Sequence, residues 1–145
     1  MYLVWNYKEI IMKNNIVIIG EYTSETEILD SFYEETDYLY HKFFTVEDFE
    51  KINMLKADII ILIANNLKHD EIIEKYLFLK KKYFVDIIVI LENKNTLNEL
   101  FKIGVKNYIF TPILKEEILI MIEKISDYNN KLEIINQFFD KFDKI

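Results

Sequence analysis

Three short apolar runs without polar interruption stand out along the chain. They cover residues 16–19, 59–64 and 87–91, and β-branched side chains dominate each of them. Continuous runs of this length are typical of strands that are buried on both faces, as in a parallel sheet covered by helices. Weaker runs over 38–44 and 108–110 have the same character. The pattern therefore predicts five strands.

Between these runs the apolar positions recur at helical spacing. This spacing predicts helices over 24–35, 46–54, 70–83 and 96–103, and helical structure in one or two pieces over 114–145. Gly104 is placed to end the fourth of these helices. Alternating strands and helices imply a parallel sheet, because each crossover returns the chain to the same edge of the sheet. The predicted fold class is α/β, a three-layer, doubly wound domain around a five-stranded parallel sheet.

The chain divides into one domain and two flanking segments. Its 145 residues suit a single domain of ordinary size. We assign 1–13 to an N-terminal extension, 14–126 to the α/β domain and 127–145 to a C-terminal helical extension.

The C-terminal region carries two apolar stripes separated by a polar segment. The first stripe contains Ile118, Ile122 and Ile125, and the second contains Leu132, Ile135, Phe138, Phe139 and Phe142. The polar segment at 127–130 is either a turn between two helices or a polar layer in one long helix. Exposing a stripe of large apolar side chains to water is unfavourable in free energy. We expect the second stripe to contact a partner or a second copy of the chain; the alternative is that it folds back on its own domain.

Composition narrows the classes of function. The formal net charge is −7, and the sequence contains neither arginine nor cysteine. An acidic chain without arginine repels nucleic acid, so no nucleic-acid partner is expected. The lack of cysteine excludes disulfides and thiolate chemistry and fits a reducing compartment. No run approaches the ~20 apolar residues of a membrane helix, and we expect a cytoplasmic protein without a membrane partner.

Two stretches of the sequence resemble the receiver domain of bacterial response regulators, the CheY-like superfamily. The stretch 57–62 is similar to the lead into the phospho-acceptor strand. The stretch 103–113 resembles the segment in which a glycine at a helix end, an aromatic strand and a Lys-Pro pair follow one another. The resemblance covers about 14–126 and implies a flavodoxin-like, receiver-like fold with a role in two-component signal transduction.

The same resemblance shows where this chain departs from a working receiver. Receivers hold Mg²⁺ with an acidic pair after the first strand and with the phospho-acceptor at the end of the third. Here Gly20 and Glu21 stand at the positions of the pair, so one carboxylate of the two remains, and the acceptor position is occupied by Ile63. Shifting the alignment by one or two residues brings Ala64 or Asn65 to that position, and neither can form an acyl phosphate.

Two further receiver positions are also changed. Leu91 stands where the resemblance places a hydroxyl at the end of the fourth strand, and Thr111 stands where it places a lysine before the proline. Nucleophile, phosphate contact and charge compensation are thus lost together. We expect a degenerate pseudo-receiver with no catalytic residues, no metal and no cofactor, which acts independently of phosphorylation.

The resemblance also implies a surface for protein partners. Receivers transmit their signal through the face formed by helix four, strand five and helix five. The corresponding positions in this chain are Leu97, Phe101, Tyr108, Ile118 and Ile122. We expect a protein partner or a homodimer to form through this face or through the C-terminal helix.

One competing hypothesis places a small ligand or a substrate in the crevice at the carboxyl end of the sheet. Open α/β folds bind ligands there, and Glu21 and Glu92 provide two carboxylates at the ends of their strands. This interpretation makes the chain a ligand-binding or enzymatic flavodoxin-like domain. The simpler interpretation is two solvated loop residues.

Overall fold

The computed structural model describes residues 15–20, 29, 39–43 and 57–143. Five strands form one sheet: β1 (Asn15–Ile19), β2 (Leu39–Phe43), β3 (Ile59–Ile63), β4 (Asp86–Leu91) and β5 (Asn107–Phe110). They are hydrogen-bonded in the order β2-β1-β3-β4-β5, and every neighbouring pair is parallel. The predicted α/β class with a parallel sheet is confirmed.

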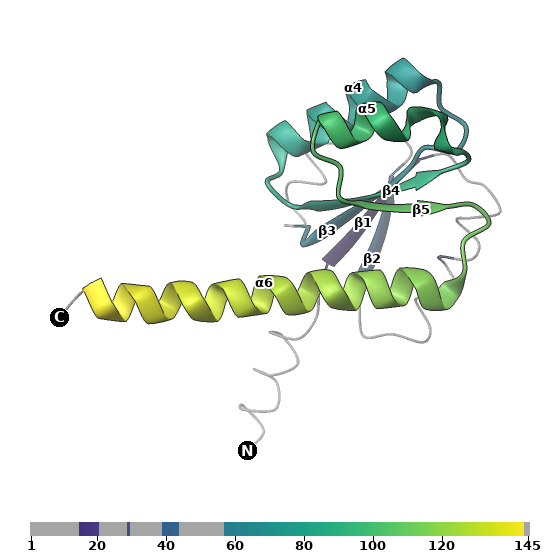
Figure 1. The fold of residues 1–145 in the computed structure, drawn as a ribbon. Helices are drawn as coiled ribbons and strands as arrows, with labels where there is room; N and C mark the ends of the chain where they lie inside the picture. Colours follow the sequence, from purple (N-terminus) through teal and green to yellow (C-terminus); the bar gives the residue numbers. More distant parts are fainter. Residues whose placement is uncertain (1–14, 21–28, 30–38, 44–56, 144–145) are drawn as a thin grey trace.

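Helices cover both faces of the sheet (Figure 1). On one face lie α4 (His69–Lys82), the 3₁₀ turn η2 (Lys94–Thr96) and α5 (Leu97–Lys102), and on the other lies α6 (Lys115–Asp143). The sheet therefore separates two apolar layers, because successive strand side chains point to opposite faces. Ile61 packs in the layer under α6, while Ile60 and Leu62 pack with α4 and α5. The helices predicted over 24–35 and 46–54 lie outside the described residues, apart from the buried Leu29.

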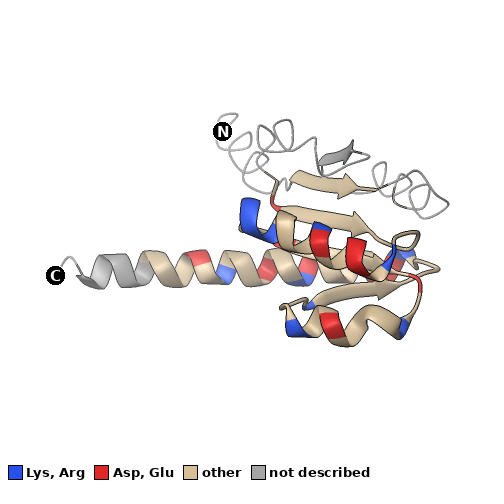
Figure 2. Cartoon of the chain, turned by 90° about the horizontal axis from the view of Figure 1, so that it is seen from above, with Lys and Arg blue, Asp and Glu red and all other residues tan. Residues whose placement is uncertain are grey.

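The ends of α4 and α5 follow local rules. Asp70 and Glu71 lie in the first turn of α4 and Lys80–Lys82 in its last turn, which complements the helix dipole; the basic end is visible in Figure 2. Gly104 ends α5 with a φ of 96°. The Gly104 amide donates to the Phe101 carbonyl and the Val105 amide donates to the Leu100 carbonyl. This is the Schellman pattern, and it confirms the predicted helix end.

A single helix forms the C-terminal part of the fold. α6 has 29 residues and runs through the polar segment 127–130 without a turn. At 1.5 Å per residue it is about 43 Å long. Its first turns pack under the sheet, and its later turns continue past the edge of the domain (Figure 1). The sequence left open either two helices joined by a turn at 127–130 or one long helix, and the structure has one long helix.

Two residues assigned to the interaction face belong to the core instead. Ile118 and Ile122 are each 1 % exposed and pack with Ile61 and Ile88 under the sheet. Their assignment to a contact surface is wrong, because the first turns of α6 bury their apolar side chains against the sheet and leave neither of these two residues for a partner. From 127 to 137 every side chain is exposed.

No helix in the described ranges is long and apolar enough to cross a membrane. Although α6 has the length to do so, charged and amide side chains interrupt its apolar positions throughout.

The burial of α6 predicts unequal effects of alanine substitutions on one helix. We expect Ile118→Ala and Ile122→Ala each to lower the free energy of unfolding by about 2–4 kcal/mol, because each leaves a cavity under the sheet. The matched control is Ile120→Ala, whose side chain is 51 % exposed and whose loss should cost about 0.5 kcal/mol or less. Urea unfolding measures all three. Equal effects at 118, 120 and 122 would contradict the packing described.

Candidate functional site

The carboxyl ends of the strands bring four predicted site residues to one edge of the sheet. Gly20 follows β1, Ile63 ends β3, Leu91 ends β4, and Thr111 follows β5. The strand order reverses between β1 and β3, and parallel α/β folds form their crevice at such a switch point. The structure therefore places these four positions where the resemblance implied, while Glu21 lies outside the described residues.

Gly20 and Ile63 are in unusually close contact across the two central strands. A Cβ atom added to Gly20 would lie 2.7 Å from the Cβ of Ile63 and 3.1 Å from its carbonyl oxygen. Gly20 also has a φ of 150°, which side-chain-bearing residues rarely adopt. No carboxylate can stand at position 20 unless β1 and β3 move apart, because the obstacle includes the backbone of β3.

The acceptor position is part of the apolar core. Ile63 is 4 % exposed and Leu91 is 1 % exposed, and both carry only carbon in their side chains. The amide of Ala64 donates to the Ile90 carbonyl at 2.9 Å, so the chain remains attached to the sheet just beyond Ile63. Ile63 thus fills a position in the layer under α6. It is not a surface position that has merely lost a carboxylate.

Thr111 supplies the one side-chain oxygen among the four positions. Its amide donates to the Leu91 carbonyl at 2.8 Å, which continues the pairing of β4 and β5, and the Thr111-Pro112 peptide bond is cis. The Thr111 side chain is half-buried. A neutral hydroxyl can donate one hydrogen bond, but it cannot balance the charge of a phosphoryl group as an ammonium does.

One cavity that described residues form at this edge is small. It has a volume of about 50 Å³ and lies between the end of β3 and the end of β4. Its lining residues are Ala64, Asn65, Leu67, Ile72, Leu91, Glu92, Asn93 and Thr96. Such a volume admits a few water molecules, whereas pockets for organic ligands are usually about 300 Å³ or larger. Glu92 is exposed at the rim, and its proposed partner Glu21 lies outside the described residues.

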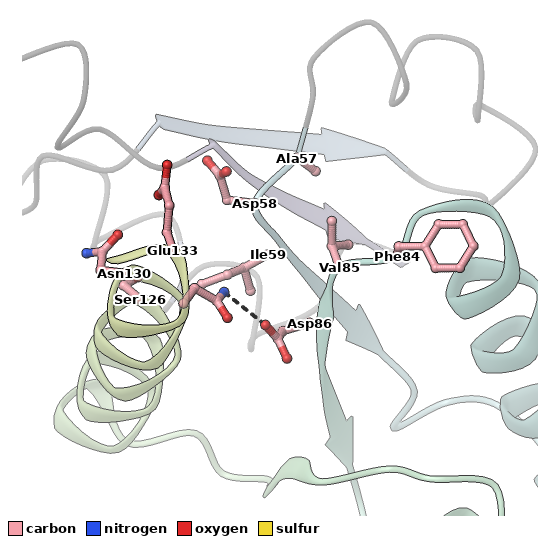
Figure 3. Close-up of a pocket in the computed structure, with 10 residues that line it drawn as sticks. Ala57, Asp58, Ile59, Phe84, Val85, Asp86, Ser126, Asn130 and Glu133 are labelled. Atoms are coloured by element: carbon pink, nitrogen blue, oxygen red, sulfur yellow. Dashed lines mark hydrogen bonds between the residues drawn. The ribbon is translucent and has the colours of Figure 1, made fainter. Parts of the chain in front are cut away.

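A larger cavity that sequence reasoning missed lies at the opposite, amino end of the sheet. It measures about 320 Å³, and Asp58, Asp86 and Glu133 contribute carboxylates to its wall (Figure 3). Asn129 of α6 donates to Asp86 at 3.0 Å, and Asp58 accepts from the amide of Asn15 at 2.8 Å. The sequence did contain a signal for this cavity, because an aspartate stands at the start of both β3 and β4. Parallel strands bring their amino ends together, so the two aspartates could have been expected to lie close to each other.

The described residues include no group of three or more histidine or acidic side chains that could hold a metal ion. In the amino-end cavity the two aspartates already accept hydrogen bonds from the chain. The hydrogen bond from Asn129 to Asp86 therefore joins α6 to the amino end of the sheet at this cavity.

Three aromatic side chains form a continuous surface on α5 and β5. The Tyr108 ring lies 5.6 Å from the Phe101 ring and 5.6 Å from the Phe110 ring, with interplanar angles of 63° and 66°. These are edge-to-face contacts, the favourable geometry for aromatic pairs. We call Phe101, Tyr108 and Phe110 the aromatic surface. Phe101 is 48 % exposed, which leaves its outer face available to a partner.

The predicted interaction face is therefore divided between two sides of the sheet. Leu97, Phe101 and Tyr108 lie on the side of α4 and α5, where Leu97 and Tyr108 pack against the same part of the core. Phe110 was missed by sequence reasoning. Its signal was the two-residue spacing from Tyr108 along a strand, which places both side chains on one face.

Burial shifts the pKa of two tyrosines on the α4 side of the molecule. Desolvation raises the pKa of Tyr76, and the carboxylate of Asp86 raises it further. Desolvation also raises the pKa of Tyr83. A phenol of ordinary pKa is already protonated at neutral pH, so these shifts change no charge there, and neither tyrosine lines the cavity at the carboxyl end of the sheet.

Known structures share this fold, although no family model matches the chain and no curated protein matches its sequence. The signal receiver domain of a modulated diguanylate cyclase from Desulfovibrio desulfuricans G20 is 18% identical, with a TM-score of 0.69 over 83% of this chain and 98% of that one. A chemotaxis response regulator of Vibrio cholerae is 13% identical, with a TM-score of 0.62 over 79% of this chain and 99% of that one.

The receiver domain of NtrC4 from Aquifex aeolicus is also similar. It is 21% identical, with a TM-score of 0.63 over 79% of this chain and 97% of that one. At these identities the likeness concerns the fold. The chain has the fold of a response-regulator receiver domain.

The close contact at Gly20 predicts a difference between the two glycines of the chain. Both have positive φ, but a Cβ at Gly104 would meet nothing within 4 Å. We expect Gly104→Ala to cost about 1–2 kcal/mol from backbone strain alone, and Gly20→Ala to cost more than about 3 kcal/mol from strain and overlap together. Thermal or urea unfolding measures the two variants. If Gly20→Ala is as stable as Gly104→Ala, β1 and β3 do not approach as described.

Proposed function

We propose that this protein is a non-catalytic, receiver-like signalling module related to two-component systems. It acts through contact with a protein partner and takes up no phosphoryl group. The observation that supports this most directly is the burial of Ile63 against Gly20 at the position where the resemblance puts the phospho-acceptor. The receiver fold is kept while the chemistry of its usual site is replaced by apolar packing.

Phosphoryl uptake needs a carboxylate nucleophile, a divalent cation and a positive group to balance the transferred charge. Among the described residues of this edge, Gly20, Ile63 and Leu91 offer no side-chain oxygen, and Thr111 offers a neutral hydroxyl. Hard cations such as Mg²⁺ require several oxygen ligands. The acceptor position thus lacks a nucleophile, and Glu92 is exposed at the rim rather than at that position. The described acidic side chains form no group of three that could hold the cation.

The aromatic surface is the proposed contact for the partner. Edge-to-face packing holds Tyr108 between Phe101 and Phe110, so the surface is pre-formed. Aromatic anchors at pre-formed surfaces contribute strongly to protein binding. In this proposal the face stays in one conformation, and signalling depends on the amount or state of the partner.

A phosphodonor experiment tests the proposal. The protein is incubated with acetyl phosphate and Mg²⁺, and separately with beryllofluoride and Mg²⁺, beside a receiver domain whose carboxylates are intact. We expect the intact mass and the melting temperature of this protein to remain unchanged, because the described acceptor position carries no nucleophile and the described residues form no cation site, while the control responds to both reagents. A mass increase by one phosphoryl group, or a melting temperature raised by beryllofluoride only when Mg²⁺ is present, would overturn the proposal.

A further inference from the structure

The exposed half of α6 continues the apolar spacing of its buried half. Ile118, Met121 and Ile125 alternate at intervals of three and four residues and pack under the sheet, Met121 being half-buried. The same intervals continue through Tyr128, Leu132 and Ile135, and in sequence through Phe139 and Phe142. We call Tyr128, Leu132 and Ile135 the exposed seam. A 3-4 spacing sustained over four heptads is the repeat by which one helix packs along another.

The exposed seam is apolar and open to solvent. Tyr128 is 64 % exposed, Leu132 is 40 % exposed and Ile135 is 48 % exposed. Tyr128 and Leu132 lie in turns whose other side, at Asn129 and Glu133, lines the amino-end cavity, and Ile135 lies beyond those turns. The seam therefore lies on a rigid helix that the domain supports at one end, and it offers the row of knobs and holes that a facing helix requires.

The residues that flank the exposed seam allow a second copy to approach. In the seven-residue repeat, the positions that flank the seam are occupied by Asn129, Lys131 and Asn136, while Asp127 and Glu133 lie farther round the helix. Although the chain has a net charge of −7, no carboxylate flanks this stretch. Asn129 donates to Asp86 of its own domain. When two copies pair along the seam, Lys131 and Asn136 of each copy lie beside the contact, and no pair of carboxylates is forced together.

We propose that the exposed seam of α6 is a dimerisation surface and that its occupant is the same helix of a second copy of this chain. The seam is self-complementary, because two identical 3-4 rows interlock, and its flanks carry no self-repelling carboxylates. This contact is separate from the aromatic surface, which remains free for the signalling partner. It goes beyond the proposed function and does not depend on whether the site at the carboxyl end of the sheet binds a phosphoryl group.

Two neighbouring isoleucines provide a matched pair of variants. Ile135 lies on the exposed seam, whereas Ile134 lies off it and is 65 % exposed. Ile135→Asp places a carboxylate in the contact, and in a dimer the substitution occurs twice. Ile134→Asp adds the same charge to the same helix but leaves the seam unchanged. Both residues are on the surface of the exposed half of α6, so the domain folds in either variant.

Sedimentation equilibrium of the full chain over a range of protein concentrations tests the proposal. We expect a monomer–dimer equilibrium for the unmodified protein, no change for Ile134→Asp, and a dissociation constant at least about 100-fold higher for Ile135→Asp. Circular dichroism checks that both variants keep their helix content. A monomer at every concentration, an aggregate larger than a dimer, or equal behaviour of the two variants would each overturn the proposal. The phosphodonor experiment is unaffected by these outcomes, so the two proposals fail separately.

Discussion

The contact between the end of β1 and the end of β3 is the physical constraint on which the proposed function depends. β1 and β3 are central in the sheet, and their carboxyl ends meet where the strand order reverses. Gly20 lets the two strands approach until a Cβ at that position would overlap the Cβ and the carbonyl oxygen of Ile63. An interior this close-packed has room neither for a carboxylate nor for its water shell. In this protein Ile63 fills the point between β1 and β3 at which an open α/β fold usually has its crevice.

This filled position shows how a receiver-like sheet can hold apolar packing where the resemblance places the phospho-acceptor. Alternate residues of each strand supply the two apolar layers, and Ile63 extends the layer under α6 by one more side chain. In a domain of this size a few kcal/mol decide stability, so an aliphatic side chain in place of a solvated carboxylate stabilises the fold. In the function that we propose, contact surfaces carry the activity. These are the aromatic surface on α5 and β5, and the exposed seam on α6.

Much of this arrangement could be predicted from the sequence, because its signals are local. The uninterrupted runs at 59–64 and 87–91 predicted buried parallel strands, and Gly104 marked the end of α5. The assignment of Ile118 and Ile122 to a contact face failed for a physical reason. An apolar stripe on a helix looks the same whether it meets its own sheet or a partner, and only the position of α6 under the sheet separates the two. The close approach at Gly20 depends on strands that are far apart in sequence, so no local pattern reveals it.

The central claim is that position 63 belongs to the apolar core. The most direct measurement compares the free energies of unfolding of Ile63→Asp and Ile63→Val in urea, with and without Mg²⁺. This account predicts a loss of about 1 kcal/mol for Ile63→Val, because one methylene is removed. It predicts a loss of more than about 3 kcal/mol for Ile63→Asp, because apolar burial is lost and a carboxyl group is desolvated. Mg²⁺ should restore none of that loss. An Ile63→Asp variant as stable as Ile63→Val, or one that Mg²⁺ stabilises, would contradict the account.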